Sequence, residues 1–301
     1  MYGRFDDERD KELERKRPES WEDMEKDRNS GVNEFEPLGV KDGIAMNMRD
    51  HTIEEVWNSE HMRNTRLQML NDQVPASCRK CFAEEEKGIV SKRQWETKVW
   101  EKRLDIDSIV EQTDADGNLP VNIPYFDLRL GNLCQLKCVM CSPHDSSSWI
   151  KEWKLQKPKY KNKDLIAEQS WDQNFDYTWY KKGSFLDSMK DQAQHIKELY
   201  FAGGEPILMQ EHWYIMDKLV ELKKFNVKIK YNTNMSKLEH NGKNALDYWR
   251  HWSHKDLIIE GSIDETGARA EWIRYGTDWK TTQSNIQTLV KENIKINQLT
   301  Q

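Results

Sequence analysis

Five cysteines stand in two tight groups, and their placement limits the chemistry that they can do. Cys78 and Cys81 form a pair, while Cys134, Cys138 and Cys141 form a triplet with three and two residues between neighbours. An odd number of cysteines at such short spacings favours metal or cluster ligation over disulfides. Three thiolates spaced like the triplet can hold three corners of an iron–sulfur cube and leave the fourth iron without a protein ligand. The triplet therefore predicts an iron–sulfur centre with one open iron.

Short polar motifs follow several apolar runs further along the chain. Gly203–Pro206 follows the run ELYFA, Tyr231–Asn234 ends the next run, and Ser262–Asp264 ends the one after it, with Arg274 twelve residues beyond the serine. The cysteine triplet likewise follows an apolar run, YFDLRL. Because the carboxyl ends of successive parallel strands meet at one edge of a sheet, we expect these motifs to form one site.

The elements that must position these motifs alternate between strand and helix patterns. Strands are expected at 125–130, 198–202, 227–232, 256–263 and 293–299, and the segment MQEHWYIMDKLVELKK between the second and third has helical periodicity. Such alternation is typical of right-handed βα units around a parallel sheet. The predicted fold class is therefore α/β.

The triplet and its companion motifs resemble those of the radical S-adenosylmethionine (SAM) enzymes, whose signatures include CxxxCxxC and GGEP. The resemblance covers about residues 123 to 301 and implies a partial (β/α)6-type barrel. Relatives usually build six βα units, but the fifth predicted strand ends two residues before Gln301. We therefore expect a barrel short of its last strand, with 293–299 at the sheet edge. Two residues depart from the family pattern: Met140 replaces a common aromatic residue, and Met235 replaces a common glycine after Asn234.

The resemblance implies a role for each matched residue. The triplet would hold a [4Fe-4S] cluster, and SAM would chelate its open iron. Expected SAM contacts are the backbone of Gly203 and Gly204 at the methionyl moiety, Glu205 at the amino group, and Asn234, Ser262 and Arg274 at the ribose and carboxylate. The implied activity is reductive SAM cleavage to a 5′-deoxyadenosyl radical that modifies a peptide, protein or small metabolite, with flavodoxin or ferredoxin as a one-electron reductant.

A noncatalytic iron–sulfur protein, either an electron carrier or a binding scaffold, is the alternative function. An electron carrier has no need of a GGEP motif or of Ser262 and Arg274. The sequence therefore favours the enzyme.

The N-terminal part divides into a charged tail over 1–45 and a small module over 46–110, followed by the barrel over 111–301. The module resembles the N-terminal twitch module of some radical SAM proteins, which carries a second iron–sulfur cluster. A complete cluster needs about four ligands, whereas the module has only Cys78 and Cys81. A second cluster, a degenerate twitch, and a zinc site completed by His51 or His61 remain as alternatives.

Two further features each allow two interpretations. His144 and Asp145 could act in acid–base catalysis, although Asp145 and Ser146–Ser148 more commonly cap the next helix. The lysine-rich segment KEWKLQKPKYKNK is interpreted as a solvated basic face, with phosphate and base contacts as the alternative.

Composition and charge exclude several classes of protein. The 301-residue chain has a formal net charge of −6 and 33% charged residues, so it has no general attraction to nucleic acid or anionic lipid. No run of 18 apolar residues and no signal peptide is present. The sequence therefore predicts a cytoplasmic protein with neither a membrane nor a nucleic-acid partner.

Overall fold

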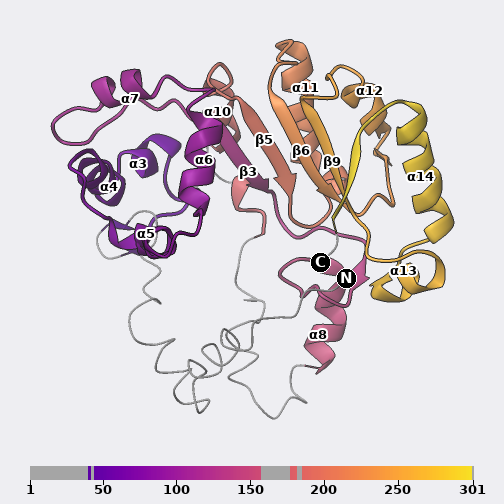
Figure 1. The fold of residues 1–301 in the computed structure, drawn as a ribbon. Helices are drawn as coiled ribbons and strands as arrows, with labels where there is room; N and C mark the ends of the chain where they lie inside the picture. Colours follow the sequence, from indigo (N-terminus) through magenta and orange to yellow (C-terminus); the bar gives the residue numbers. More distant parts are fainter. Residues whose placement is uncertain (1–39, 42–43, 157–176, 182–184, 300–301) are drawn as a thin grey trace, which may run out of the picture. The chain divides into compact units, whose positions relative to one another are not determined.

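The computed structural model describes residues 40–41, 44–156, 177–181 and 185–299 (Figure 1). The chain divides into two compact units, a smaller one formed by 1–46 and 56–119 and a larger one formed by 47–55 and 120–301. Most of the predicted tail lies outside the described residues. The smaller unit holds the Cys78 and Cys81 pair and ends at Leu119, beyond the predicted boundary at residue 110.

Short helices build the smaller unit. Its elements are β1 (Val40–Lys41), β2 (Ile44–Ala45), the end of α3 (Ile53–Trp57), α4 (Glu60–Leu70), the 3-10 turn η1 (Ala76–Cys78), α5 (Arg79–Glu86), α6 (Lys92–Trp100) and α7 (Ile106–Gln112). Asn58 and Ser59 separate α3 from α4. The Asn58 amide donates to the Leu119 carbonyl at 3.1 Å, and Arg66 donates to the Gly117 carbonyl at 3.0 Å. The Asn58 side chain, between the two helices, thus bonds to the loop that ends this unit at Leu119.

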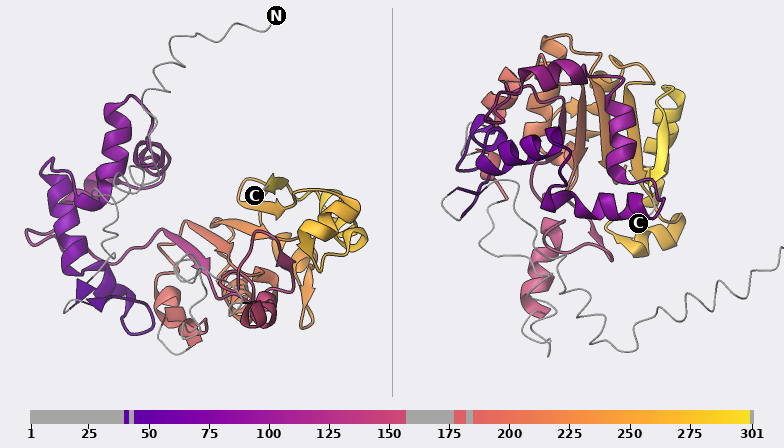
Figure 2. Two further views of the ribbon diagram at one scale, coloured as in Figure 1. Left: turned by 90° about the horizontal axis from the view of Figure 1, so that it is seen from below. Right: turned by 60° about the vertical axis from the view of Figure 1, so that its left-hand side comes forward.

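A five-stranded parallel sheet is the centre of the larger unit. Its strands are β3 (Tyr125–Arg129), β5 (Glu198–Ala202), β6 (Lys228–Thr233), β9 (Leu257–Ser262) and β11 (Ile296–Leu299), and all five were predicted. The strand order is β11-β9-β6-β5-β3, with the strands side by side in Figure 1 and in the right-hand view of Figure 2. Each strand therefore lies beside the next one along the chain, as in a barrel wall and unlike a doubly wound sheet.

One face of this sheet is apolar because alternate residues of each strand share a face. Leu128, Phe201, Tyr231 and Ile259 align in register across four strands, and all four are buried. The Phe201 and Tyr231 rings stack with centroids 5.1 Å apart. Helices contribute Trp213, Met216, Trp249 and Leu289 to the same core. These residues come from α11 (Gln210–Glu221), α12 (Ala245–Trp249) and α14 (Trp279–Lys291).

The opposite face of the sheet is polar. Asp127, Tyr200 and Lys230 align in register on β3, β5 and β6, and Lys230 forms an ion pair with Glu198 at 2.7 Å. A parallel sheet covered by helices on both faces is apolar on both. The polar face therefore fits the inner wall of a partial barrel, as predicted.

The remaining elements of the larger unit connect or flank these strands. They are β4 (Lys137–Cys138), η2 (Ser147–Trp149), α8 (Ile150–Gln156), η4 (Trp179–Lys181), α10 (Phe185–Asp191), η5 (Pro206–Leu208), β7 (Glu239–His240), β8 (Lys243–Asn244), α13 (Gly267–Ile273) and β10 (Arg274–Tyr275). Among the described residues β11 pairs with β9 alone, so the predicted edge position is confirmed. Within the described part of the chain, every helix is too short or too polar to cross a membrane.

Candidate functional site

The sequence motifs meet in one cavity at the carboxyl ends of the strands. The cavity has a volume of about 230 Å³. Eight of the predicted site residues line it: Cys134, Cys138, Cys141, Gly203, Gly204, Asn234, Ser262 and Arg274. These residues lie at or just after the ends of β3, β5, β6 and β9, except Arg274, which pairs with Cys138. The structure therefore places the motifs in one cavity, as their order along the chain predicted.

Three side chains that follow the triplet donate hydrogen bonds to backbone carbonyls of the cysteine loop. Ser146 Oγ donates to Leu136 O at 2.6 Å, Ser148 Oγ to Cys134 O at 2.7 Å, and Trp149 Nε1 to Cys138 O at 3.0 Å. These bonds satisfy carbonyls that a buried loop would otherwise leave unpaired. Ser146 occupies the N-cap position of η2 but makes no capping bond with its side chain, so the predicted capping by the serine run is wrong. Asp145 instead accepts from the backbone N–H of Ser142 at 3.1 Å.

The GGEP turn holds the same loop from a second side. The Glu205 N–H donates to the Leu133 carbonyl at 2.8 Å. Gly204 has φ +52°, and a Cβ atom there would lie 2.5 Å from that same carbonyl oxygen. Glycine is therefore required at 204 for close packing against the cysteine loop, in addition to any approach of a ligand.

A two-residue strand pair brings Arg274 to the triplet. Arg274 of β10 lies opposite Cys138 of β4 in antiparallel register, and its Nη1 donates to the Cys138 sulfur at 3.8 Å. Its Nε donates to Asp264 at 2.7 Å. Its Nη2 is buried without a hydrogen-bond partner in the described structure. Because the residue lines the cavity, a bound anionic group would give this nitrogen its missing acceptor.

The three thiols differ in how readily they ionise. Burial raises the pKa of Cys134 to about 11. The Cys141 thiol donates to the Cys138 sulfur and, together with Arg274, lowers the pKa of Cys138 to about 7. The same bond and burial raise the pKa of Cys141. Cys138 is therefore the thiol most readily converted to a thiolate ligand.

The three cysteines that line the cavity are of the ligand type that an iron–sulfur cluster takes. In the part of the chain that the structure describes, no three His, Cys, Asp or Glu side chains are arranged around one metal ion. A cube binds each cysteine at a different iron, so its thiolates need not converge on one point as the ligands of zinc do. Three thiols around one cavity, with Arg274 beside them, meet this looser requirement.

The structure places Glu205 outside the cavity lining, which differs from its expected contact with the SAM amino group. Its buried carboxylate accepts from Thr233 Oγ1 and from the Asn234 N–H, both at 2.8 Å, and from the Ile207 N–H at 3.3 Å. Burial raises its pKa to about 7. Asn234 Nδ2 in turn donates to the Cys134 sulfur at 3.9 Å. Glu205 thus joins the GGEP turn to the residue that contacts the triplet.

The two departures from the family pattern have different consequences. Met140 lines the cavity, where its thioether can contact a ligand. Met235 is fully buried and has φ +62°, a left-handed conformation that glycine adopts without cost. The chain therefore keeps at 235 the backbone shape that glycine would favour.

Sequence reasoning missed part of the cavity wall. Arg129, Tyr200 and Asn232 line the cavity from the polar face of the sheet, and Asn232 Oδ1 is buried without a partner among the described residues. Polar residues alternate with apolar ones in these strands, and this pattern was the available signal. His144 does not line the cavity; its Nδ1 lies 2.9 Å from the Tyr177 hydroxyl. Most of the lysine-rich segment lies outside the described residues.

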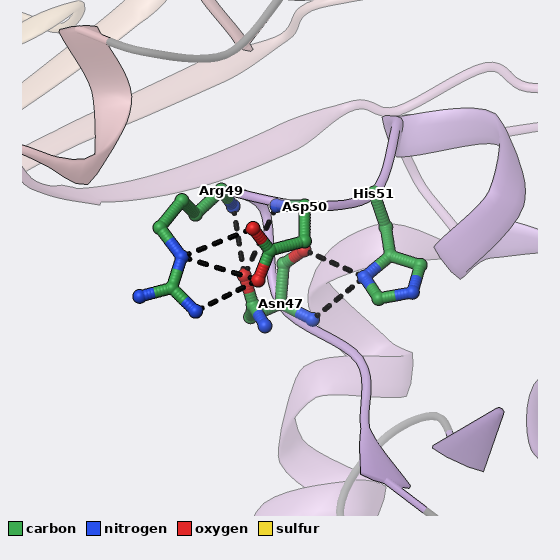
Figure 3. A network of polar contacts seen from close by, with 4 residues as sticks. All are labelled: Asn47, Arg49, Asp50 and His51. Carbon is green, nitrogen blue, oxygen red and sulfur yellow. Dashed lines mark hydrogen bonds and ion pairs between the residues drawn. The ribbon is translucent and has the colours of Figure 1, made fainter. Parts of the chain in front are cut away.

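The Cys78 and Cys81 pair belongs to the smaller unit, at the start of α5. No described group of three metal-ligating side chains includes these thiols. His51, one candidate zinc ligand, has its Nδ1 3.2 Å from the Asn47 carbonyl oxygen (Figure 3). His51 belongs to the larger unit, and the second cluster, the degenerate twitch and the zinc site at the pair stay predictions.

Comparisons with known proteins gave matches among solved structures alone. No protein-family model and no curated protein matches the chain. Native anSMEcpe with bound AdoMet and Cp18Cys peptide is 16% identical, with a TM-score of 0.36 over 59% of this chain and 42% of that one. Streptococcus suis SuiB bound to S-adenosylmethionine is 14% identical, with a TM-score of 0.37 over 82% of this chain and 47% of that one. The chain thus spans less than half the length of each.

Proposed function

We propose that the chain is a radical SAM enzyme. One observation carries the proposal: three thiols, the Gly203–Gly204 turn and an unpartnered guanidinium nitrogen of Arg274 line a single cavity. An electron carrier needs the thiols but has no use for a buried guanidinium donor that lacks a partner. When bound at the triplet, a [4Fe-4S] cluster supplies the electron that cleaves SAM to a 5′-deoxyadenosyl radical.

The chain's own residues bind, position and exclude water around that chemistry. Cys134, Cys138 and Cys141 would hold the cluster. Arg274 Nη2 would donate to the SAM carboxylate, while Asp264 accepts from Arg274 Nε and fixes the orientation of the guanidinium. Ser262 closes the cavity at the end of β9. Glu205 acts indirectly, by holding the backbone of Asn234.

The polar wall of the cavity supports a polar substrate. Arg129, Tyr200 and Asn232 offer a cation, a hydroxyl and an unpaired amide oxygen on one surface. We propose a peptide, protein or polar metabolite as substrate, a flavodoxin or ferredoxin as the one-electron reductant, and the cytoplasm as the compartment.

Anaerobic cluster reconstitution followed by reduction with SAM present tests the proposal. We expect 5′-deoxyadenosine from the wild-type protein and none from the Cys134→Ala, Cys138→Ala or Cys141→Ala variants. The matched control is Cys81→Ala, which removes a thiol from the other unit and should retain cleavage. A protein that keeps its cluster, binds no SAM and forms no 5′-deoxyadenosine would be an electron carrier or scaffold instead.

A further inference from the structure

A carboxylate stands on the polar face of the sheet beside the cavity. Asn232, which lines the cavity, is the register partner of Glu260 on the parallel strands β6 and β9. Register partners on neighbouring strands point to the same face, and such strands lie about 4.8 Å apart. Ser262, two residues further along β9, lines the cavity as well. Glu260 is therefore on the cavity side of the sheet, and it is partly buried there.

Other charged groups on this face already have partners. Arg129 Nε donates to Asp127 at 3.3 Å, and Lys230 forms its ion pair with Glu198 at 2.7 Å. Glu260 has neither a hydrogen bond nor an ion pair with any residue that the structure describes. The two pairs cancel their own charges, so Glu260 is left as an uncompensated negative charge. A partly buried carboxylate of this kind is stabilised by a cation that binds beside it.

Two uncharged polar groups next to Glu260 also lack partners. Asn232 Oδ1 is buried without a hydrogen-bond partner in the described structure. The Tyr200 hydroxyl, from the neighbouring strand β5, makes no hydrogen bond to a described residue either. Burial and the Glu260 carboxylate raise the pKa of Tyr200, so the charge of Glu260 acts on the cavity side, where Tyr200 is part of the lining. Glu260, Asn232 and Tyr200 together form what we call the acceptor site.

We propose that the acceptor site binds an ammonium or guanidinium group of the substrate. An ammonium has three N–H donors and a guanidinium five, which is enough for the Glu260 carboxylate, Asn232 Oδ1 and the Tyr200 oxygen together. An anionic group would meet the Glu260 charge, whereas the nearest cation of the cavity lining, Arg129, is already paired with Asp127. The inference rests on the function proposed above and narrows its polar substrate to a cationic one. Free amines or guanidines and the lysine or arginine side chains of a peptide share this chemistry.

Matched probes test the proposal on the full chain, reconstituted anaerobically, with SAM present and without reductant. The cationic probes are N-acetyl-lysine amide and N-acetyl-arginine amide as peptide-like forms, and 1-aminopentane and butylguanidine as free forms. N-acetyl-norleucine amide is the neutral control, and N-acetyl-glutamate amide is the anionic one. In saturation-transfer NMR titrations we expect the cationic amides to bind about tenfold more tightly than the norleucine amide. A preference for the amides over the free forms indicates a peptide as the source, and the reverse indicates a metabolite.

Variants of Glu260 assign the binding to this site. Glu260→Gln should weaken binding of the cationic amides about tenfold, because a charge-assisted hydrogen bond is replaced by a neutral one, and should leave the norleucine amide unaffected. Glu260→Lys should reverse the preference and favour the glutamate amide. Glu221→Gln, on the exposed side of α11, is the matched control and should bind every probe as the wild type does. SAM affinity, measured by calorimetry, should be the same in Glu260→Gln and the wild type.

Several results would overturn the proposal. They are cationic amides that fail to bind the wild type, that bind it no better than the norleucine amide, or that bind Glu260→Gln as tightly as the wild type. A tenfold loss of SAM affinity in Glu260→Gln would overturn it as well, because Glu260 would then belong to the SAM site. None of these measurements requires SAM cleavage. Failure of the proposed enzyme function is therefore seen separately, as the absence of 5′-deoxyadenosine after reduction of a protein that still binds the cationic amides.

Discussion

Glu205 makes the stability of the larger unit depend on pH. Burial raises its pKa from the ordinary value of 4.5 to about 7. Between these pH values the folded state keeps the proton that the unfolded chain releases, so the stabilising contribution is complete below pH 4.5 and is lost as the pH rises through about 7. At about 1.4 kcal/mol per pH unit, the loss amounts to about 3 kcal/mol.

Replacement by glutamine removes this titration but does not copy the protonated acid. The carboxyl group receives three donors: the Thr233 hydroxyl and the Asn234 and Ile207 N–H groups. A protonated acid accepts on both oxygens and can reverse the bond with the Thr233 hydroxyl. An amide group must point its NH2 at one of the two backbone donors, which costs about 1–3 kcal/mol. Glu205→Gln should therefore be less stable than the wild type at pH 5, and the stability difference should move by about 2.5 kcal/mol in favour of the variant between pH 5 and pH 8.

A second buried group titrates in the opposite direction and determines how the measurement is made. Burial lowers the pKa of His212 from 6.5 to about 3, so its unfavourable contribution grows as the pH falls below 6.5. Between pH 4.5 and 6.5 the two effects oppose each other in the wild type. The useful quantity is therefore the difference between wild type and Glu205→Gln at each pH, in which the His212 contribution cancels.

Hydrogen exchange of peptides covering β5 and β6 measures that difference inside the larger unit alone, and equal pH for both proteins cancels intrinsic exchange rates. Glu221→Gln, on the exposed side of α11, is the matched control and should leave this exchange unchanged at every pH. A wild-type minus variant difference that stays constant within about 0.5 kcal/mol from pH 5 to 8 would refute the raised pKa of Glu205.

Three substitutions test how the cavity is built. Gly204→Ala should destabilise the larger unit by about 2 kcal/mol or more, through left-handed strain and loss of the bond to the Leu133 carbonyl, and should lower the iron content after reconstitution. Met235→Gly relieves about 1 kcal/mol of left-handed strain but removes a fully buried side chain worth about 2–5 kcal/mol, so urea titration should show a net loss of stability. Arg274→Gln should weaken SAM binding about tenfold in calorimetry of the reconstituted protein, whereas Arg269→Gln, on the exposed face of α13, should not.

The strands and the order of the motifs could be predicted from the sequence because both are local properties. An apolar run followed by a polar motif identifies a strand and its carboxyl end, and five such runs gave all five strands of the sheet. Parallel topology then brings those ends together without further information. Eight predicted site residues line one cavity for this reason.

The contacts that the sequence did not predict join segments that are distant along the chain. Arg274 reaches Cys138 through a pairing of two-residue strands 136 positions apart, and such short strands have no periodicity to detect. Glu205 turns away from the cavity because Thr233 and Asn234, on the next strand, donate to it. Neither outcome follows from residue type or spacing.

The serine run after the triplet shows how a local pattern and a tertiary contact can favour different roles for the same residues. Ser146 and Ser148 stand where helix-capping residues commonly do, yet their hydroxyls donate to carbonyls of the cysteine loop. The loop passes close to the GGEP turn, where Leu133 O already accepts from the Glu205 N–H, so its other carbonyls need donors from the remaining side. A capping side chain accepts hydrogen bonds from the free backbone N–H groups of a helix. The cysteine loop instead has backbone carbonyls that need a donor. The Ser146 and Ser148 hydroxyls therefore donate to the cysteine loop. Together with the GGEP turn, these bonds hold the loop from two sides and keep its sulfurs at one cavity.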